Sequence, residues 1–195
     1  MNLQTVDDII EMYHTYGNED YDGEPVSQAS HMIQCAMLAI KEKADDELVL
    51  GAFLHDIGHL LGHLVNAEDM DGFGAVNHEN IGAAFLKQAG FSNRICAVVE
   101  HHVNAKRYLV ATDETYSKKL SEASWRTLKW QGGPMTSNEI EIFKDHRYFD
   151  DIIKVRLWDE QAKDANAEVL SISYFSNLLQ HHLANAKHEG IVSSI

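Results

Sequence analysis

Apolar residues recur at the three- and four-residue spacing of amphipathic helices along most of this chain. The first such stretch follows Thr5, which stands with Asp8 at the spacing of a capping box, so a helix of about three turns is expected there. The same pattern predicts helices over residues 27–43, from 45 or 46 to about 58, 77–90, from 92 to beyond 102, 113–131, a short one from 136, 147–165 and 171–185. This periodicity, with two prolines in the chain, indicates an all-α helical bundle.

The length of 195 residues suits one well-buried domain and is short for two. No internal repeat or linker interrupts the pattern, so residues 1–195 are expected to form one domain with its functional core at residues 20–160. Cys35 and Cys96 lie among apolar residues and are expected in the core. No signal sequence opens the chain and no apolar run approaches the ~20 residues of a membrane span, so a cytoplasmic location without a membrane partner is expected.

The net charge of the chain limits the kinds of molecule that it can bind. The formal net charge is −14, which repels nucleic acid and anionic membranes, and an anionic small molecule would need a locally basic pocket. Twelve histidines are many for this length, and they are the anomaly of the composition.

One apolar stretch contains three polar side chains close together, His55, Asp56 and His59: Ala52-Phe53-Leu54-His55-Asp56-Ile57-Gly58-His59. On a helix, His55 and His59 share one face, because positions i and i+4 are neighbours. Asp56 can turn inward where the helix ends, and Gly58 favours an end there.

Further candidate metal ligands occupy the apolar faces of other predicted helices: His31, His78, His102 and Asp159. A single histidine on an apolar face is more often a satisfied core residue than a ligand. Six such groups on successive helices are poorly explained by chance, and imidazole with carboxylate suits divalent metals. Because Asp56 is adjacent to His55, it is the natural carboxylate to bridge two metals. His101 and His102 cannot both face the core, and His102, four residues after Val98, is the better inward candidate.

The order His…His-Asp…His…His…Asp resembles the HD-domain superfamily, many of whose members are metal-dependent phosphohydrolases. Longer blocks resemble the HD-type mixed-valent diiron oxygenases of organophosphonate breakdown: Tyr21-Asp22-Gly23-Glu24, Gln34-Cys35-Ala36, Leu54-His55-Asp56-Ile57-Gly58-His59, His102-Val103-Asn104-Ala105-Lys106-Arg107-Tyr108-Leu109-Val110, Gln131-Gly132-Gly133-Pro134-Met135 and Trp158-Asp159-Glu160. The likeness covers residues 20–160.

The resemblance implies an Fe(II)/Fe(III) pair that uses O2 to cleave a carbon–phosphorus bond. One iron would be held by His31, His55, Asp56 and Asp159, and the other by His78, His102 and the bridging Asp56. Tyr21 would be a further ligand of the second iron, displaced by substrate. The family's phosphonate-contacting positions correspond to His59, Lys106, Ser124, Gln131 and Arg156. Two cations and several directional hydrogen-bond donors suit that task.

The resemblance also implies that Glu24 recognises the substrate nitrogen. Asp22 and Asp20 make this approach acidic, with Tyr21 between them. A trimethylammonium group has no N–H and is held by diffuse negative charge and aromatic faces, for which Trp125 and Trp130 are further candidates. We therefore expect the trimethylammonio compound, (R)-1-hydroxy-2-(trimethylammonio)ethylphosphonate, to be the substrate, with 2-amino-1-hydroxyethylphosphonate as the alternative.

Other functions stay open at this level. A metal-dependent phosphohydrolase would use the same ligands with a metal-bound hydroxide. A catalytically silent HD domain would not need all six ligands, and an inositol-type diiron oxygenase would not need Lys106 and Gln131. The same donors would also bind Mn or Zn. The sequence leaves the oligomeric state open.

Overall fold

The computed structural model describes residues 5–21, 23–65, 67–70 and 74–192, and for residues 187–192 it describes the backbone alone. Its regular elements over these residues are α-helices, with two isolated β-bridges between Asp20 and Ser27 and between Asp69 and Ala75. The all-α prediction is therefore confirmed. The helices are α1 (Val6–Tyr16), α2 (Gln28–Lys41), α3 (Asp46–Leu54), α4 (Ile57–Val65), α5 (His78–Ala89), α6 (Asn93–Thr112), α7 (Glu114–Lys119), α8 (Glu122–Trp130), α9 (Ser137–Lys144), α10 (Phe149–Gln161) and α11 (Ile172–Val192).

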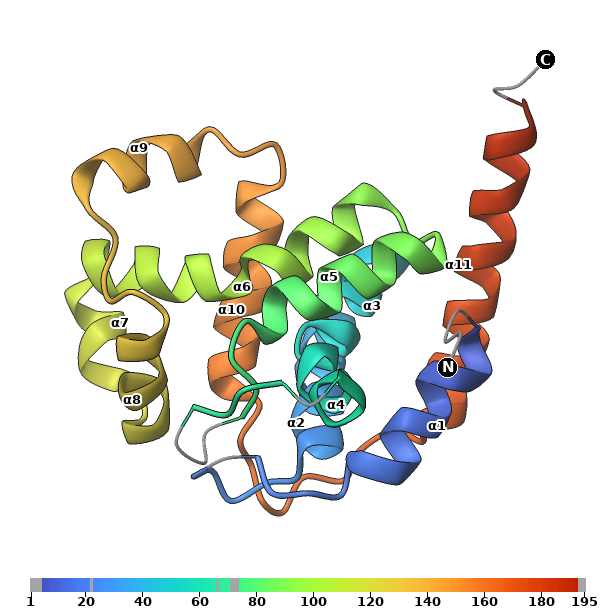
Figure 1. Ribbon diagram of the computed structural model, residues 1–195, viewed down its shortest axis with the longest axis horizontal. Coiled ribbons are helices and arrows are strands. Elements are labelled where there is room, and N and C mark those ends of the chain that lie inside the picture. The colour runs from blue at the N-terminus through green and yellow to red at the C-terminus, as the bar shows by residue number, and fades with distance from the viewer. Residues whose placement is uncertain (1–4, 22, 66, 71–73, 193–195) are drawn as a thin grey trace.

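The helices surround a central group made of α2, α3 and α4 (Figure 1). The long helix α6 packs against α3, α5 and α10, and α10 also packs against α2. Helices α1 and α11 lie together at one end of the molecule, and α7, α8 and α9 lie at the other (Figure 1). No single described helix is long and apolar enough to span a membrane, although the bent pair α3–α4 meets that test when its two helices are taken together.

The core is continuous across the central helices. Phe53 of α3 is fully buried, and its ring stacks between Tyr13 of α1 and Phe175 of α11, at centroid distances of 4.4 and 4.2 Å. Cys35 and Cys96 are buried free thiols, as predicted. This packing anchors α3, the helix that leads into His55 and Asp56, against α1 and α11.

Several helix boundaries differ from the predicted ones. The predicted helix through the His-Asp pair is broken, because α3 ends at Leu54 and α4 begins at Ile57 with its axis bent by 44°. Gly58 does not end a helix but lies in the first turn of α4, where a Cβ atom would stand 1.8 Å from the carbonyl oxygen of His78. This glycine permits α4 and α5 to approach closely.

The predicted helix over residues 113–131 is also two helices. Leu120 adopts extended backbone angles, and the side chain of Ser121 accepts a hydrogen bond from the backbone of Ser124, which starts α8. The helix predicted over 147–165 is shorter at both ends, and α11 extends past the predicted residue 185.

Candidate metal centre and adjoining cavity

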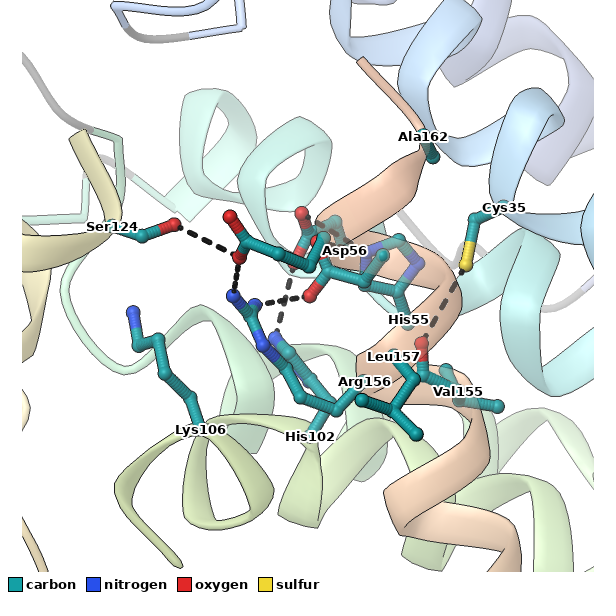
Figure 2. Close-up of polar contacts among 12 residues, drawn as sticks. Cys35, His55, Asp56, His102, Lys106, Ser124, Val155, Arg156, Leu157 and Ala162 are labelled. Carbon is teal, nitrogen blue, oxygen red and sulfur yellow. Dashed lines mark hydrogen bonds and ion pairs between the residues drawn. The ribbon is translucent and has the colours of Figure 1, made fainter. Parts of the chain in front are cut away.

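The candidate centre begins at the break between α3 and α4, where His55 and Asp56 form the connecting turn. Both side chains are buried, and the Nε2 atom of His55 lies 3.3 Å from Oδ2 of Asp56. Side chains adjacent in sequence diverge on a continuous helix, because they are about 100° apart around its axis. The break therefore lets both face the same interior point (Figure 2).

Four histidines share one arrangement around this point. In each, Nδ1 lies within hydrogen-bonding distance of a backbone carbonyl oxygen: His31 with Ala162 at 2.9 Å, His55 with Ala52 at 2.8 Å, His78 with Ala75 at 3.2 Å and His102 with Val99 at 2.7 Å. A carbonyl oxygen only accepts, so Nδ1 carries the proton and a neutral ring leaves Nε2 free as a donor of electrons. Backbone partners of this kind orient histidine ligands in metal sites.

The histidines form two groups, one on each oxygen of Asp56. The Nε2 atoms of His31 and His55 lie 3.6 and 3.3 Å from Oδ2, and Asp159 Oδ1 lies 3.3 Å from His31 on the same side. The Nε2 atoms of His78 and His102 lie 3.4 and 3.2 Å from Oδ1. Asp56 thus joins a first group (His31, His55, Asp159) to a second group (His78, His102).

These atoms fit metal ions better than they fit one another. The Nε2 atoms of His31 and His55 are 3.2 Å apart, and those of His78 and His102 are 3.1 Å apart. Two unprotonated nitrogens cannot hydrogen-bond to each other, whereas both can coordinate one cation. Within the described residues, Asp56 Oδ2 and Asp159 Oδ1 are buried and have no hydrogen-bond partner. The donor set accommodates a metal centre with a shared carboxylate.

The carboxylates of this centre are ionised. Burial alone would raise the pKa of Asp56, but the imidazoles around it, His55 first and then His102 and His31, hold that pKa well below its usual range. Burial likewise opposes ionisation of Asp159, and the neighbouring Arg156 guanidinium lowers the pKa well below its usual range. Anionic oxygens are the form that a metal cation requires.

A cavity of about 40 Å³ adjoins the centre. All the predicted substrate-contacting residues within the described part of the chain line it: Tyr21, Glu24, His59, Lys106, Ser124, Gln131 and Arg156. Asp22, which the sequence also suggested, lies outside the described residues. Asp56, His78, His102 and Asp159 form the inner wall of the cavity, so bound substrate would contact the metal centre directly.

Donors and cations face this wall. The Nδ1 atom of His59 accepts a hydrogen bond from the backbone of Ala75 at 3.0 Å. Burial, and next the neighbouring imidazole of His78, lower the pKa of His59 well below its usual range, so the ring is neutral and Nε2 carries its proton. The ammonium of Lys106 donates to Thr127 Oγ1 at 2.9 Å, and burial followed by the nearby Arg156 charge lowers its pKa to about 7.

Arg156, predicted as a phosphonate contact, also has three partners within the protein. Its Nε donates to the hydroxyl of Tyr116 at 2.7 Å, and its two terminal nitrogens pair with Asp159 and Glu160. Figure 2 shows the guanidinium between the buried cluster and Ser124, with Lys106 on the same side. Each terminal nitrogen carries a second N–H, so the group can still donate into the cavity.

The turn that carries Tyr21 and Glu24 forms a further part of the cavity wall. The backbone N–H of Glu24 donates to the carbonyl of Tyr21 at 2.8 Å, and Gly23 has φ of 77°, a conformation that glycine adopts at little cost. The Tyr21 ring stacks on His31 at 3.9 Å, although the resemblance assigned this tyrosine to the second metal. Burial, and then the charge of Asp56, raise the pKa of the Tyr21 phenol well above its usual range.

Sequence reasoning missed several residues next to the site. Lys163 pairs with Glu24 at 3.0 Å, and Glu160 and Tyr116 hold Arg156. Glu160 belongs to the Trp158-Asp159-Glu160 block described above, whereas no local sequence pattern distinguishes Lys163 or Tyr116. Trp125 and Trp130, considered above as aromatic partners for the substrate, are exposed and are not among the residues that line the cavity.

Comparisons with known proteins bear on this site. A family model described as "HD domain" matches residues 29–147. The chain is 42% identical over 164 residues to a [1-hydroxy-2-(trimethylamino)ethyl]phosphonate dioxygenase (glycine-betaine-forming) from Leisingera caerulea, covering 84% of this chain and 83% of that protein. It is 35% identical to a hydroxymethylphosphonate dioxygenase from Gimesia maris, covering 82% of this chain and 79% of that one. An uncharacterized protein of Acanthamoeba polyphaga mimivirus is 36% identical over 94% of this chain and 84% of its own.

Proposed function

The chain belongs to the HD-domain family and is an oxygenase of its phosphonate-cleaving group, and from this premise we propose that it uses a mixed-valent diiron centre and O2 to cleave the C–P bond of (R)-1-hydroxy-2-(trimethylammonio)ethylphosphonate. The products are glycine betaine and phosphate. The choice of this substrate rests on the similarity to the protein from Leisingera caerulea and on the acidic residues around Glu24.

The observation that carries the proposal is the position of Asp56 between two histidine pairs. One oxygen faces His31 and His55, and the other faces His78 and His102, within 3.2–3.6 Å. Such an arrangement supports two metals about one carboxylate. His31, His55, Asp56 and Asp159 would hold the first iron, and Asp56, His78 and His102 the second, with Tyr21 as an additional ligand. When bound, the irons supply the one-electron and O2 chemistry that protein side chains lack.

The cavity residues bind and orient the substrate. Lys106 and Arg156 supply positive charge for the phosphonate, while His59 Nε2–H, Ser124 and Gln131 supply directional hydrogen bonds. Glu24 supplies negative charge for the substrate nitrogen, and burial of the cavity excludes bulk water. In the balanced reaction, one O2 reacts with the substrate, whose phosphonate group is doubly ionised. The products are glycine betaine, hydrogen phosphate (HPO4 with two negative charges) and one proton. The C–P bond and the C–H bond of the same carbon are broken.

The test is incubation of iron-loaded protein with the trimethylammonio, amino and hydroxymethyl phosphonates, with phosphate release and O2 uptake measured together. We expect one phosphate per O2 with the trimethylammonio compound and no phosphate under anaerobic conditions. An Asp56→Asn variant serves as the inactive control.

Two results would contradict the proposal at different levels. Turnover of the amino compound in place of the trimethylammonio compound would refute the substrate and leave the reaction class intact. Anaerobic cleavage of phosphate esters, with no O2-dependent phosphate from any phosphonate, would identify a phosphohydrolase.

A further inference from the structure

The carboxylate of Glu24 already has a cationic partner in this chain. Lys163, in the segment after α10, places its ammonium 3.0 Å from Glu24 Oε1. The two side chains are only 13% and 10% exposed, so the pair is shielded from water and interacts more strongly than a surface pair. The position where the proposed function puts a substrate cation is thus taken by a lysine.

The backbone around Lys163 is fixed relative to the metal centre. The carbonyl of its neighbour Ala162 is the partner of His31 Nδ1. On the other side, the Gln34 amide both donates to the Asp164 carbonyl and accepts from the Asp164 N–H, each at 3.0 Å. Two ties to α2 therefore hold the main chain in place, and movement at this position falls to the lysine side chain.

Lys163 has other acceptors within reach. Its ammonium also lies 3.1 Å from Glu160 Oε1, 3.2 Å from Ser121 Oγ and 3.5 Å from Ser124 Oγ. An ammonium has three N–H donors, so Lys163 can release Glu24 and keep its charge paired by Glu160. Release is therefore far less costly than exposing an unpaired buried cation.

The cavity beside Glu24 is too small for substrate in this arrangement. Its volume of about 40 Å³ holds about three water molecules, whereas ligand pockets typically measure about 300–1,000 Å³. Entry of a phosphonate with a nitrogen substituent requires side chains at the Glu24 side to move. Breaking the Lys163–Glu24 pair is a movement that a positively charged group can drive by replacing the lysine.

We propose that Lys163 is a specificity-determining residue that competes, as a tethered ammonium, with the substrate's own cation for Glu24. The inference rests on the proposed function. A substrate that carries an ammonium group must displace Lys163 from Glu24, whereas a hydroxyphosphonate without nitrogen binds with the pair intact. Lys163 therefore lowers the preference for ammonium-bearing over nitrogen-free substrates, because specificity is a difference between two binding free energies.

The experiment measures kcat/KM for the trimethylammonio compound and for hydroxymethylphosphonate, which carries no nitrogen. The proteins are the wild type, Lys163→Met, Glu24→Gln, the double variant, and Lys118→Met as a matched control. Lys118 pairs with Glu114 on the exposed surface of α7, so its removal deletes the same charge away from the site. Dissociation constants for both compounds, measured without O2 by calorimetry, separate binding from turnover.

In Lys163→Met, the ratio of kcat/KM for the trimethylammonio compound to kcat/KM for hydroxymethylphosphonate should rise about tenfold, the range expected for gaining one charge-assisted contact. The Lys118→Met ratio should match the wild type. Glu24→Gln should lower the ratio, and adding Lys163→Met to it should change nothing further. Loss of loop order would affect both substrates alike and leave the ratio unmoved. A general electrostatic effect of the deleted charge weighs more on hydroxymethylphosphonate, whose net charge is more negative by one, and it persists in the Glu24→Gln background, which separates it from competition at Glu24.

The outcomes separate the two proposals. An active wild type whose ratio stays constant or falls in Lys163→Met overturns the competitor role alone. An effect of Lys163→Met that persists in the Glu24→Gln background also overturns it, because the change would not act through Glu24. A wild type that turns over no phosphonate overturns the proposed function and this inference together.

Discussion

Gly58 offers the sharpest test of how the second metal group is positioned. A Cβ atom added to this residue would stand 1.8 Å from the carbonyl oxygen of His78 and 2.5 Å from its carbon, both of which are backbone atoms. Because Cβ contacts essentially never fall below 3.0 Å, the oxygen must retreat by at least 1.2 Å in Gly58→Ala. His78 opens α5 and supplies Nε2 to the second group.

Such a displacement exceeds what a metal site tolerates, since ligand distances are fixed to within about 0.2 Å. We expect Gly58→Ala to bind one metal in place of two, and to keep the group formed by His31, His55 and Asp159. Overpacking of this kind costs about 1–3 kcal/mol, which corresponds to a fall in Tm of roughly 2–12 °C for a chain of this size. Metal analysis of the purified protein and calorimetric unfolding measure the two effects.

Gly51→Ala is the matched control within α3. Its Cβ would lie 3.1 Å from Val98 Cγ1, a side-chain atom, so adjustment by a few tenths of an ångström suffices. This variant should keep two metals per chain. A Gly58→Ala protein with two metals and the wild-type Tm would refute the reasoning, because it would mean that α4 and α5 can separate without disturbing His78.

Three further predictions concern the centre and the cavity. Asp56→Asn should lose both metals, whereas Asp159→Asn should lose only the first; equal metal content in the two variants would argue against a shared carboxylate. Because burial and Arg156 lower the pKa of Lys106 to about 7, the ammonium is charged below pH 7 and loses its proton above it. The KM for a phosphonate should therefore rise above pH 7, and a steady-state profile of Lys106→Met that kept this rise would contradict the assignment. In the part of the chain that the structure describes, buried oxygens of Asp56 and Asp159 lack hydrogen-bond partners, so chelation should lower the Tm and Fe(II) should restore it; an unchanged Tm in the chelated protein would contradict the fit of a metal.

Features encoded within one helix were predictable from the sequence. The capping box at Thr5 forms as its spacing from Asp8 indicated, and the short helix predicted from residue 136 begins with a second one at Thr136. The inward direction of His31, His78 and His102 followed from apolar neighbours three and four residues away, and all three are buried. Each of these depends on contacts within a few residues, which is the range over which helical periodicity carries information.

Features that depend on distant contacts were not predictable in this way. The break after Leu54 was not predicted because every residue of α3 from Leu48 to Leu54 is buried. The helix therefore has no polar face, and a bend leaves no visible change in the order of apolar and polar residues. The pairing of Lys163 with Glu24 joins segments 139 residues apart. The residues next to a lysine in the sequence do not indicate that it has a buried acidic partner, since most lysines are exposed to solvent.

The order of the candidate ligands along the chain has a consequence for biosynthesis. Asp56, His78 and His102 all precede residue 103, while Asp159 follows 57 residues after His102 and arrives with α10. A nascent chain therefore carries every proposed donor of the second group before Asp159, the last donor of the first group, is synthesised, because synthesis proceeds from the N-terminus. Docking of α10 brings in the last carboxylate together with Arg156, which pairs with it. Synthesis of the candidate ligands is thus ordered in time, and a chain ending in α9 contains Asp56, His78 and His102 but lacks Asp159.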